Sequence, residues 1–136
     1  MNYYPLNSFR LCIDECQNNI HCGRIYTPLY DKPIYFYDLT HMVLLMDQVF
    51  DQNDYPKAYQ TKRSFSLIKP KKHKPQYKYS INELTQQLGN VSSYDVVVVT
   101  RQHTSWQGMI KNIKGEILGH FDSDLDLIQI IINLLK

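Results

Sequence analysis

Five residues in two predicted hairpins have side chains suited to gripping an anionic or planar ligand. Arg101, Gln102, Trp106 and Gln107 bracket one polar turn, and Arg24 lies in the corresponding hairpin of the first half of the chain. A guanidinium group binds anions, an indole ring anchors interfaces, and amides give directed hydrogen bonds. We expect these residues to form a ligand- or partner-binding site. The alternative is that Trp106 plugs the end of a sheet beneath a helix.

Cysteine and histidine side chains near the N-terminus are of the types that bind zinc. Cys12, Cys16, His21 and Cys22 are the candidates. A zinc site needs four converging ligands. On an extended strand, at about 3.3 Å per residue, Cys12 and Cys16 would lie more than about 10 Å apart, which is too far for one ion. We therefore expect no metal and free thiols. An odd number of cysteines without an export signal indicates a cytoplasmic location.

No pattern in the chain is typical of catalysis. His103, Thr104 and Ser105 have the letters of a hydrolase triad, but adjacent turn residues point in different directions. The acidic residues at 122–126 lack the glycine and the glutamate of a calcium loop, and we expect them to cap a helix. Phosphate loops, nucleophile elbows and dinucleotide-binding fingerprints are absent from the sequence. We therefore expect no enzyme and no cofactor.

Hydrophobic patterning predicts the strands and helices that carry these residues. In the second half, 94–100 is a β-branched stretch that predicts a buried strand, 106–111 predicts a second strand and 116–121 a third. Gly108 indicates a bulge or a close backbone approach. A helix is expected to begin near 122–124 and to continue to the C-terminus.

The first half follows the same order. Strands are expected at 9–14, 23–26 and 34–37, followed by a helix that Asp38 or Thr40 caps. The two halves align without a gap at an offset of 85 residues, which places Gly23 on Gly108.

These patterns predict an α+β fold of two strand–strand–strand–helix units, with an antiparallel sheet and helices packed on one face. The units are either a pseudo-twofold internal repeat or two convergent hairpin–helix structures. The predicted organisation is a first unit at 1–52, a basic, proline-containing linker at 53–90 with a short helix at 81–88, and a second unit at 91–136.

Charge and hydropathy exclude two classes of protein. The formal net charge of the 136 residues is +2, which argues against a general nucleic-acid coat. No apolar run reaches the roughly 20 residues that cross a bilayer, so we expect no membrane partner. Lysines and tyrosines of the basic middle, 55–79, could still bind single-stranded RNA or DNA, and the alternative is a solvated linker.

Three segments resemble a family of small proteins common in clostridia and related Firmicutes. They are CGRIYTPL at 22–29, KRSF at 62–65 and RQHTSWQG at 101–108. The family is uncharacterised, so the resemblance implies a bacterial, cytosolic setting but no activity and no site.

The preferred function is a non-enzymatic binding or adaptor protein. Apolar residues surround most of the C-terminal helix, which predicts a homodimer through that helix. One alternative is a protein that binds or sequesters a small anionic, nucleotide-like ligand through Arg101, Trp106 and Arg24. The other is the single-stranded RNA or DNA binder.

Overall fold

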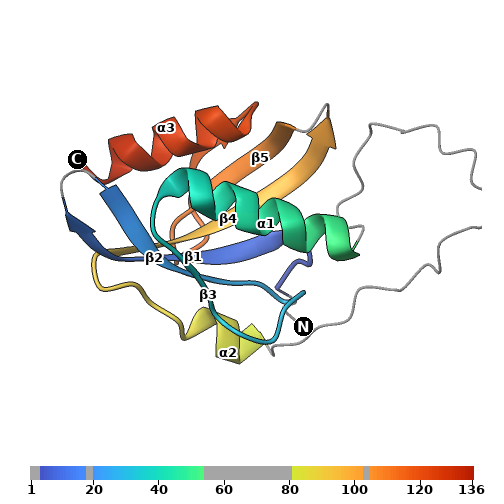
Figure 1. Ribbon diagram of the computed structural model, residues 1–136, viewed down its shortest axis with the longest axis horizontal. Helices are drawn as coiled ribbons and strands as arrows, with labels where there is room; N and C mark the ends of the chain where they lie inside the picture. Colours follow the sequence, from blue (N-terminus) through green and yellow to red (C-terminus); the bar gives the residue numbers. More distant parts are fainter. Residues whose placement is uncertain (1–3, 18–19, 54–80, 103–104) are drawn as a thin grey trace, which may run out of the picture.

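The computed structural model describes residues 4–17, 20–53, 81–102 and 105–136, without the side chains of 15–17, 81, 82 and 102. Six strands form one antiparallel sheet in the order β3-β2-β1-β4-β5-β6 (Figure 1). The elements are β1 (Ser8–Gln17), β2 (Ile20–Tyr26), β3 (Ile34–Phe36), α1 (Leu39–Asn53), α2 (Ile81–Thr85), β4 (Ser92–Gln102), β5 (Ser105–Lys111), β6 (Ile117–Phe121) and α3 (Asp124–Leu134). The predicted α+β class is confirmed.

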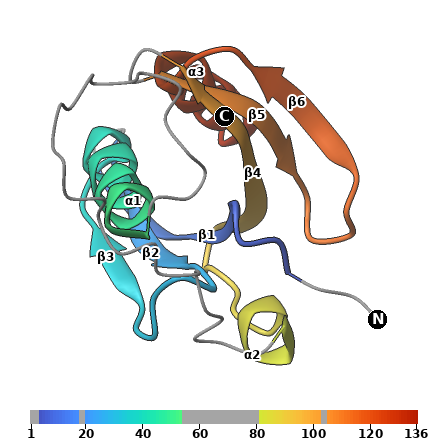
Figure 2. The same cartoon turned by 90° about the vertical axis from the view of Figure 1, so that its right-hand side faces the viewer.

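Helices cover the two faces of the sheet unequally. Helix α1 contacts β2 and β3, and α3 contacts β5 and β6. Figure 2 shows α2 on the opposite side of β1 and β2 from α1. There Leu84 is buried with Tyr4, Cys12 and Tyr26 in a small second cluster. The two long helices therefore share one face, as predicted, whereas α2 ends at Thr85 and lies on the other face.

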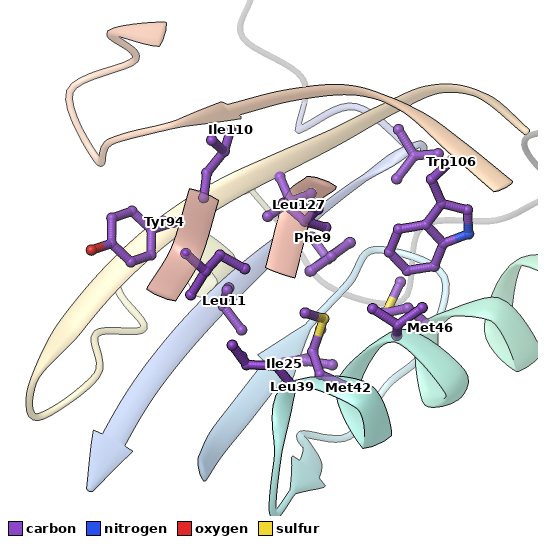
Figure 3. Close-up of a cluster of buried hydrophobic side chains, with 14 of the residues drawn as sticks. Phe9, Leu11, Ile25, Leu39, Met42, Met46, Tyr94, Trp106, Ile110 and Leu127 are labelled. Atoms are coloured by element: carbon purple, nitrogen blue, oxygen red, sulfur yellow. The ribbon is translucent and has the colours of Figure 1, made fainter. Parts of the chain in front are cut away.

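The main core lies between the sheet and the two long helices. Alternate residues of β1, Phe9, Leu11 and Ile13, point into it and are fully buried. They meet one apolar face of α1 and the buried Leu127 of α3 (Figure 3). Because both halves of the chain contribute to this one core, the two predicted units are not independent globules.

The two units match in register as well as in the order of elements. Leu11 pairs with Ile25 in the first unit, and the residues 85 positions further on, Val96 and Ile110, pair in the second. A β-bulge follows Ile13 in β1, and another occupies the equivalent place after Val98 in β4. The pairing of β2 with β3 is repeated in the same way by β5 with β6. This correspondence supports the internal-repeat interpretation, and duplication itself stays a prediction.

Two equivalent glycines allow the strands to approach closely at these bulges. A Cβ atom on Gly23 would lie 1.9 Å from the carbonyl oxygen of Cys12, and one on Gly108 would lie 1.9 Å from that of Val97. Neither position can hold a side chain without backbone movement. The close approach expected at Gly108 is therefore present, and it has a counterpart at Gly23.

Side chains cap both long helices at equivalent positions. The Oδ1 atom of Asp38 accepts a hydrogen bond from the backbone N–H of His41 at 2.7 Å. The Oγ atom of Ser123 accepts one from the N–H of Asp126 at 3.0 Å. Each bond satisfies a free donor in the first turn of its helix and fixes where the helix begins.

Helix α3 has much of its second apolar face covered within the chain. Ile128, Ile130, Ile132 and Leu135 are partly buried against the main core, and Leu125, at 74% exposure, is the most exposed. Much of the apolar surface that favoured a homodimer thus has an internal partner, and the dimer stays a prediction. None of the helices in the described ranges is long and apolar enough to cross a membrane.

Candidate functional site

Trp106 of β5 lies in the core between the sheet and α1 (Figure 3). Its side chain is 1% exposed. The indole makes edge-to-face contacts with Phe9 and Phe50, with ring centroids 6.1 and 5.7 Å away. Its Nε1–H donates a hydrogen bond of 3.0 Å to the Oδ1 atom of Asp47 on α1. Trp106 is therefore packed between the sheet and α1, and its ring is not accessible to a ligand.

Arg101 of β4 lies in the same buried cluster as Trp106. Its guanidinium group is 4% exposed and donates from NH1 to Asp51 Oδ1 at 2.8 Å and to Asp47 Oδ1 at 3.4 Å. It also lies over the ring of Phe50, 5.5 Å from the centroid. Asp51 is in the last turns of α1, where the helix dipole disfavours an acid, and the nearby cation offsets that effect. Arg101 thus fastens α1 to the sheet.

The two acids that join Arg101 and Trp106 were not among the predicted site residues. Asp47 and Asp51 are four residues apart on α1, so they share one side of the helix. Their spacing was a signal for a cation partner on a neighbouring element. Which element supplies that cation follows only from the way α1 crosses the sheet.

Gln107 points to the other side of the sheet, as alternation along β5 requires. Its Oε1 accepts a hydrogen bond of 2.7 Å from Thr100 Oγ1, and its Nε2 donates to the carbonyl oxygen of Asp122 at 3.3 Å. The side chain of Gln102 is not described. Of the four predicted site residues whose side chains are described, only Arg101 and Trp106 come together, through Asp47.

Arg24 lies in the other half of the sheet and fastens the segment that leaves α2. Its Nε and NH2 donate to the Asp14 carboxylate at 2.8 and 2.9 Å. NH1 donates to the Tyr26 hydroxyl and NH2 to the carbonyl oxygen of Leu88, each at 2.8 Å. The hydrogen bonds from Arg24 lower the pKa of Asp14. These hydrogen bonds give Arg24 a structural role, because they hold the segment after α2 against the sheet.

A second arginine holds the same segment from the centre of the sheet. Arg10 is buried and donates to both oxygens of the Asp95 carboxylate, at 2.7 and 2.9 Å. Its NH1 also donates to the carbonyl oxygens of Thr85 and Gln87, at 3.2 and 3.1 Å. Tyr4 donates to Asp95 at 2.6 Å, and burial, followed by the charge of Asp95, raises the pKa of that hydroxyl. Arg10 therefore binds the carbonyl groups at the end of α2.

Within the described ranges, a groove between β3 and α1 is a surface feature suited to binding. It has a volume of about 250 Å³, just below the roughly 300–1,000 Å³ of small-molecule pockets. Its lining consists of Tyr30, Pro33, Ile34, Leu45, Gln48, Val49 and Gln52. None of these side chains is charged. The groove thus has the size and chemistry to take one large apolar side chain, with two glutamine amides at its wall.

Exposed tyrosines surround this end of the sheet. Tyr35 of β3 and Tyr37 just beyond it are each 67% exposed, and Tyr30 lines the groove itself. The ring of Tyr37 stacks on that of His41, with centroids 3.8 Å apart. Tyrosine is enriched in the contact residues of protein interfaces, because it pairs a large apolar ring with a polar tip.

The second unit has a different packing at the equivalent place. Gly119 of β6 stands where β3 has Ile34, and Ile130 of α3 stands where α1 has Leu45. Methyl groups of Ile130 lie 3.4 Å from the Cβ position of Gly119, so the helix side chain packs directly on the edge strand. The groove between β3 and α1 is thus a departure from the correspondence between the units.

The fold and this groove define a small α+β protein with one antiparallel sheet and an apolar groove at one edge. Comparison with protein-family models, curated proteins and solved structures found no match to the chain. The resemblance to the clostridial family therefore stays an expectation. Within the described ranges, no three His, Cys, Asp or Glu side chains gather where a metal ion could bind, and Cys12 is a buried, free thiol.

Proposed function

We propose that this protein is a non-enzymatic binding or adaptor protein that recognises another polypeptide through the groove between β3 and α1. The observation that carries the proposal is the groove itself: about 250 Å³, open at the surface, with an uncharged lining. A few anchor side chains buried in well-packed, desolvated pockets carry most of the binding energy of protein interfaces. The anchor we propose is an uncharged side chain of the size of leucine, methionine or phenylalanine, since a charge there would lose its water without gaining a partner.

Three further features support a polypeptide rather than a small ligand. The volume of the groove is small for a drug-sized molecule, which usually needs a larger cavity. Gln48 and Gln52 lie one turn apart on the exposed side of α1, and their amides can donate to and accept from a peptide backbone. Tyr30 adds an aromatic wall.

The anionic-ligand alternative has less support. Arg101 and Arg24, which would hold the anion, both make ion pairs with carboxylates of the same chain. Trp106 is buried and cannot stack on a planar ligand. The RNA or DNA alternative depends on residues 55–79, which lie outside the described ranges. The cytoplasmic, bacterial setting and the homodimer belong to the proposal as expectations from the sequence.

The test is selection of random phage-displayed peptides on the immobilised full-length protein. Enriched peptides would then be synthesised with a fluorophore, and binding would be measured by fluorescence polarisation. We expect enriched peptides to share one apolar anchor residue. Gln48→Arg, which places a long charged side chain at the groove wall, should weaken binding at least tenfold.

Leu44→Arg is the matched control. It adds the same side chain to α1 at another exposed position, 57% exposed and outside the groove lining, and should leave the affinity unchanged within a factor of two. Circular dichroism should show that both variants are folded. If no peptide is enriched, or if the enriched peptides bind Gln48→Arg as tightly as the original protein, the proposed function is wrong.

A further inference from the structure

We infer that the partner of the groove binds as an added β-strand on the outer edge of β3. This inference rests on the proposed function and specifies the partner: an extended peptide segment with apolar residues at alternate positions. β3 is the last strand on one side of the sheet, and in the described part of the chain only β2 pairs with it. An edge strand presents N–H and C=O groups that another extended chain can pair with.

The face on which the groove opens matches the alternation of such a strand. Ile34 pairs with the buried Ile25 and shares its face of the sheet, beneath α1. Ile34 also lines the groove, together with Leu45 of α1. A residue opposite Ile34 on an added strand, about 4.8 Å further out, would point to this same face. Its side chain would therefore point into the groove that Ile34 and the α1 residues line.

The neighbouring position supplies a second contact on the other face. Tyr35 follows Ile34 in β3, so its side chain points away from α1, and it is 67% exposed. Aromatic side chains stabilise strand pairs by packing on the residue opposite or diagonal to them on the same face. The next residue of the added strand would pack on this ring. Alternate residues of the partner would thus meet the groove and Tyr35 in turn.

A peptide fits this edge better than a second copy of the chain. β3 has three residues, Ile34–Phe36, which is about 10 Å of strand. A stable dimer interface buries roughly 800 Å² on each partner, more than a three-residue edge and one side-chain pocket provide. A short peptide with one anchor needs no more than this area. The opposite edge, β6, lacks a comparable site because Ile130 packs directly over Gly119.

N-methylation of a selected peptide, one residue at a time, tests the added strand. In a strand pair the edge bonds the N–H groups of every second residue of the partner. We expect methylation at those positions to weaken binding at least tenfold and methylation at the positions between them to weaken it less than threefold. Amide hydrogen exchange of residues 34–36 should slow when the peptide is bound.

The two edge strands provide a matched pair of positions on the protein. Tyr35→Ala should weaken binding of the peptide at least fivefold, whereas Ile117→Ala, at an exposed position of the opposite edge strand β6, should not change its affinity. Uniform or absent effects of N-methylation, with no protection of residues 34–36, would overturn the added strand. If Gln48→Arg still weakens binding of that peptide, the proposed function is retained even though the added strand is wrong. If the selection enriches no peptide, both the proposed function and the added strand are wrong.

Discussion

Arg10 and Asp95 face each other across β1 and β4, and they are 85 residues apart in the chain, the same offset that aligns the two units. They therefore occupy one equivalent position in both units, and a twofold axis relating the units would pass between them. An exact repeat would place two identical side chains there, and two like charges would repel each other. The difference between arginine and aspartate is thus what allows an ion pair at the centre of the sheet.

Replacing Arg10 with methionine should lower the free energy of unfolding by about 3–5 kcal/mol, the usual cost of removing one partner of a buried ion pair. In this variant Asp95 keeps its hydrogen bond from Tyr4 but loses its ion pair. The carbonyl oxygens of Thr85 and Gln87 also lose their hydrogen bonds from Arg10. Urea denaturation at pH 7 measures the loss. Arg24→Met is the control, because its ion pair is partly exposed and should cost about 1 kcal/mol. Equal losses in the two variants would contradict the central role of Arg10.

Alanine at Gly23 and at Gly108 should destabilise the protein to a similar degree, each by more than about 2 kcal/mol, because backbone must move to admit the Cβ atom. Gly119→Ala is the control, since the atoms nearest to its Cβ would be side-chain atoms, of Ile130 at 3.4 Å and of Ile110 at 3.8 Å. Thermal unfolding of the three variants provides the comparison. A loss at Gly119 as large as at the other two positions would contradict the explanation by close strand approach.

Trp106→Phe should cost about 2–3 kcal/mol of stability and leave peptide binding unchanged. The change removes part of a buried ring and the hydrogen bond to Asp47, while Trp106 contributes nothing to the lining of the groove. Urea denaturation followed by circular dichroism gives the stability, and polarisation gives the affinity. A weaker affinity with unchanged stability would restore Trp106 as a recognition residue.

The stability of the protein should fall between pH 9 and pH 11 because of the thiol of Cys12. Burial raises the pKa of Cys12 from 9.0 to about 11, so the thiol stays neutral when folded but ionises in the unfolded chain. Its contribution is present below pH 9 and is lost as the pH rises towards 11. Under reducing conditions, the stability difference between the original protein and Cys12→Val should shrink by about 1 kcal/mol from pH 8 to pH 10. An unchanged difference would show that burial leaves the thiol's ionisation unaffected.

The predicted homodimer has a direct test in light scattering. A dimer through α3 should have about twice the 16.1 kDa mass of the chain, and Leu125→Glu should return it to the monomer mass. Leu44→Glu on α1 is the matched control. A monomer mass for the unmodified protein at all concentrations would leave α3 covered only by its own chain.

Much of the secondary structure was predictable because it depends on local patterns. The strands, the long helices and the caps at Asp38 and Ser123 follow from alternation, helical spacing and side chains that bond nearby backbone. The hairpin pairings were also local, since consecutive strands joined by short turns pair with each other. Gly108 indicated its own close contact because no other residue fits there.

The candidate site was less predictable. Arg101, Trp106 and Arg24 have the residue types of a binding site, but their partners Asp47, Asp51 and Asp14 already engage or cover them. The groove gave no signal in the sequence, because it depends on where α1 crosses the edge strand. Two differences between equivalent positions, Ile34 against Gly119 and Leu45 against Ile130, accompany an open groove in one unit and direct packing in the other.

Local sequence patterns were enough to predict two similar units, each of three strands and a helix, and the places where their turns and caps fall. Long-range packing, in contrast, joins the units into one sheet through β1 and β4, buries Trp106 and places the groove at β3. The two sets of features differ in the range of the interactions that produce them. Turns, caps and periodicity act between residues a few positions apart, whereas the pairing of Arg10 with Asp95 depends on the free energy of the whole shared core.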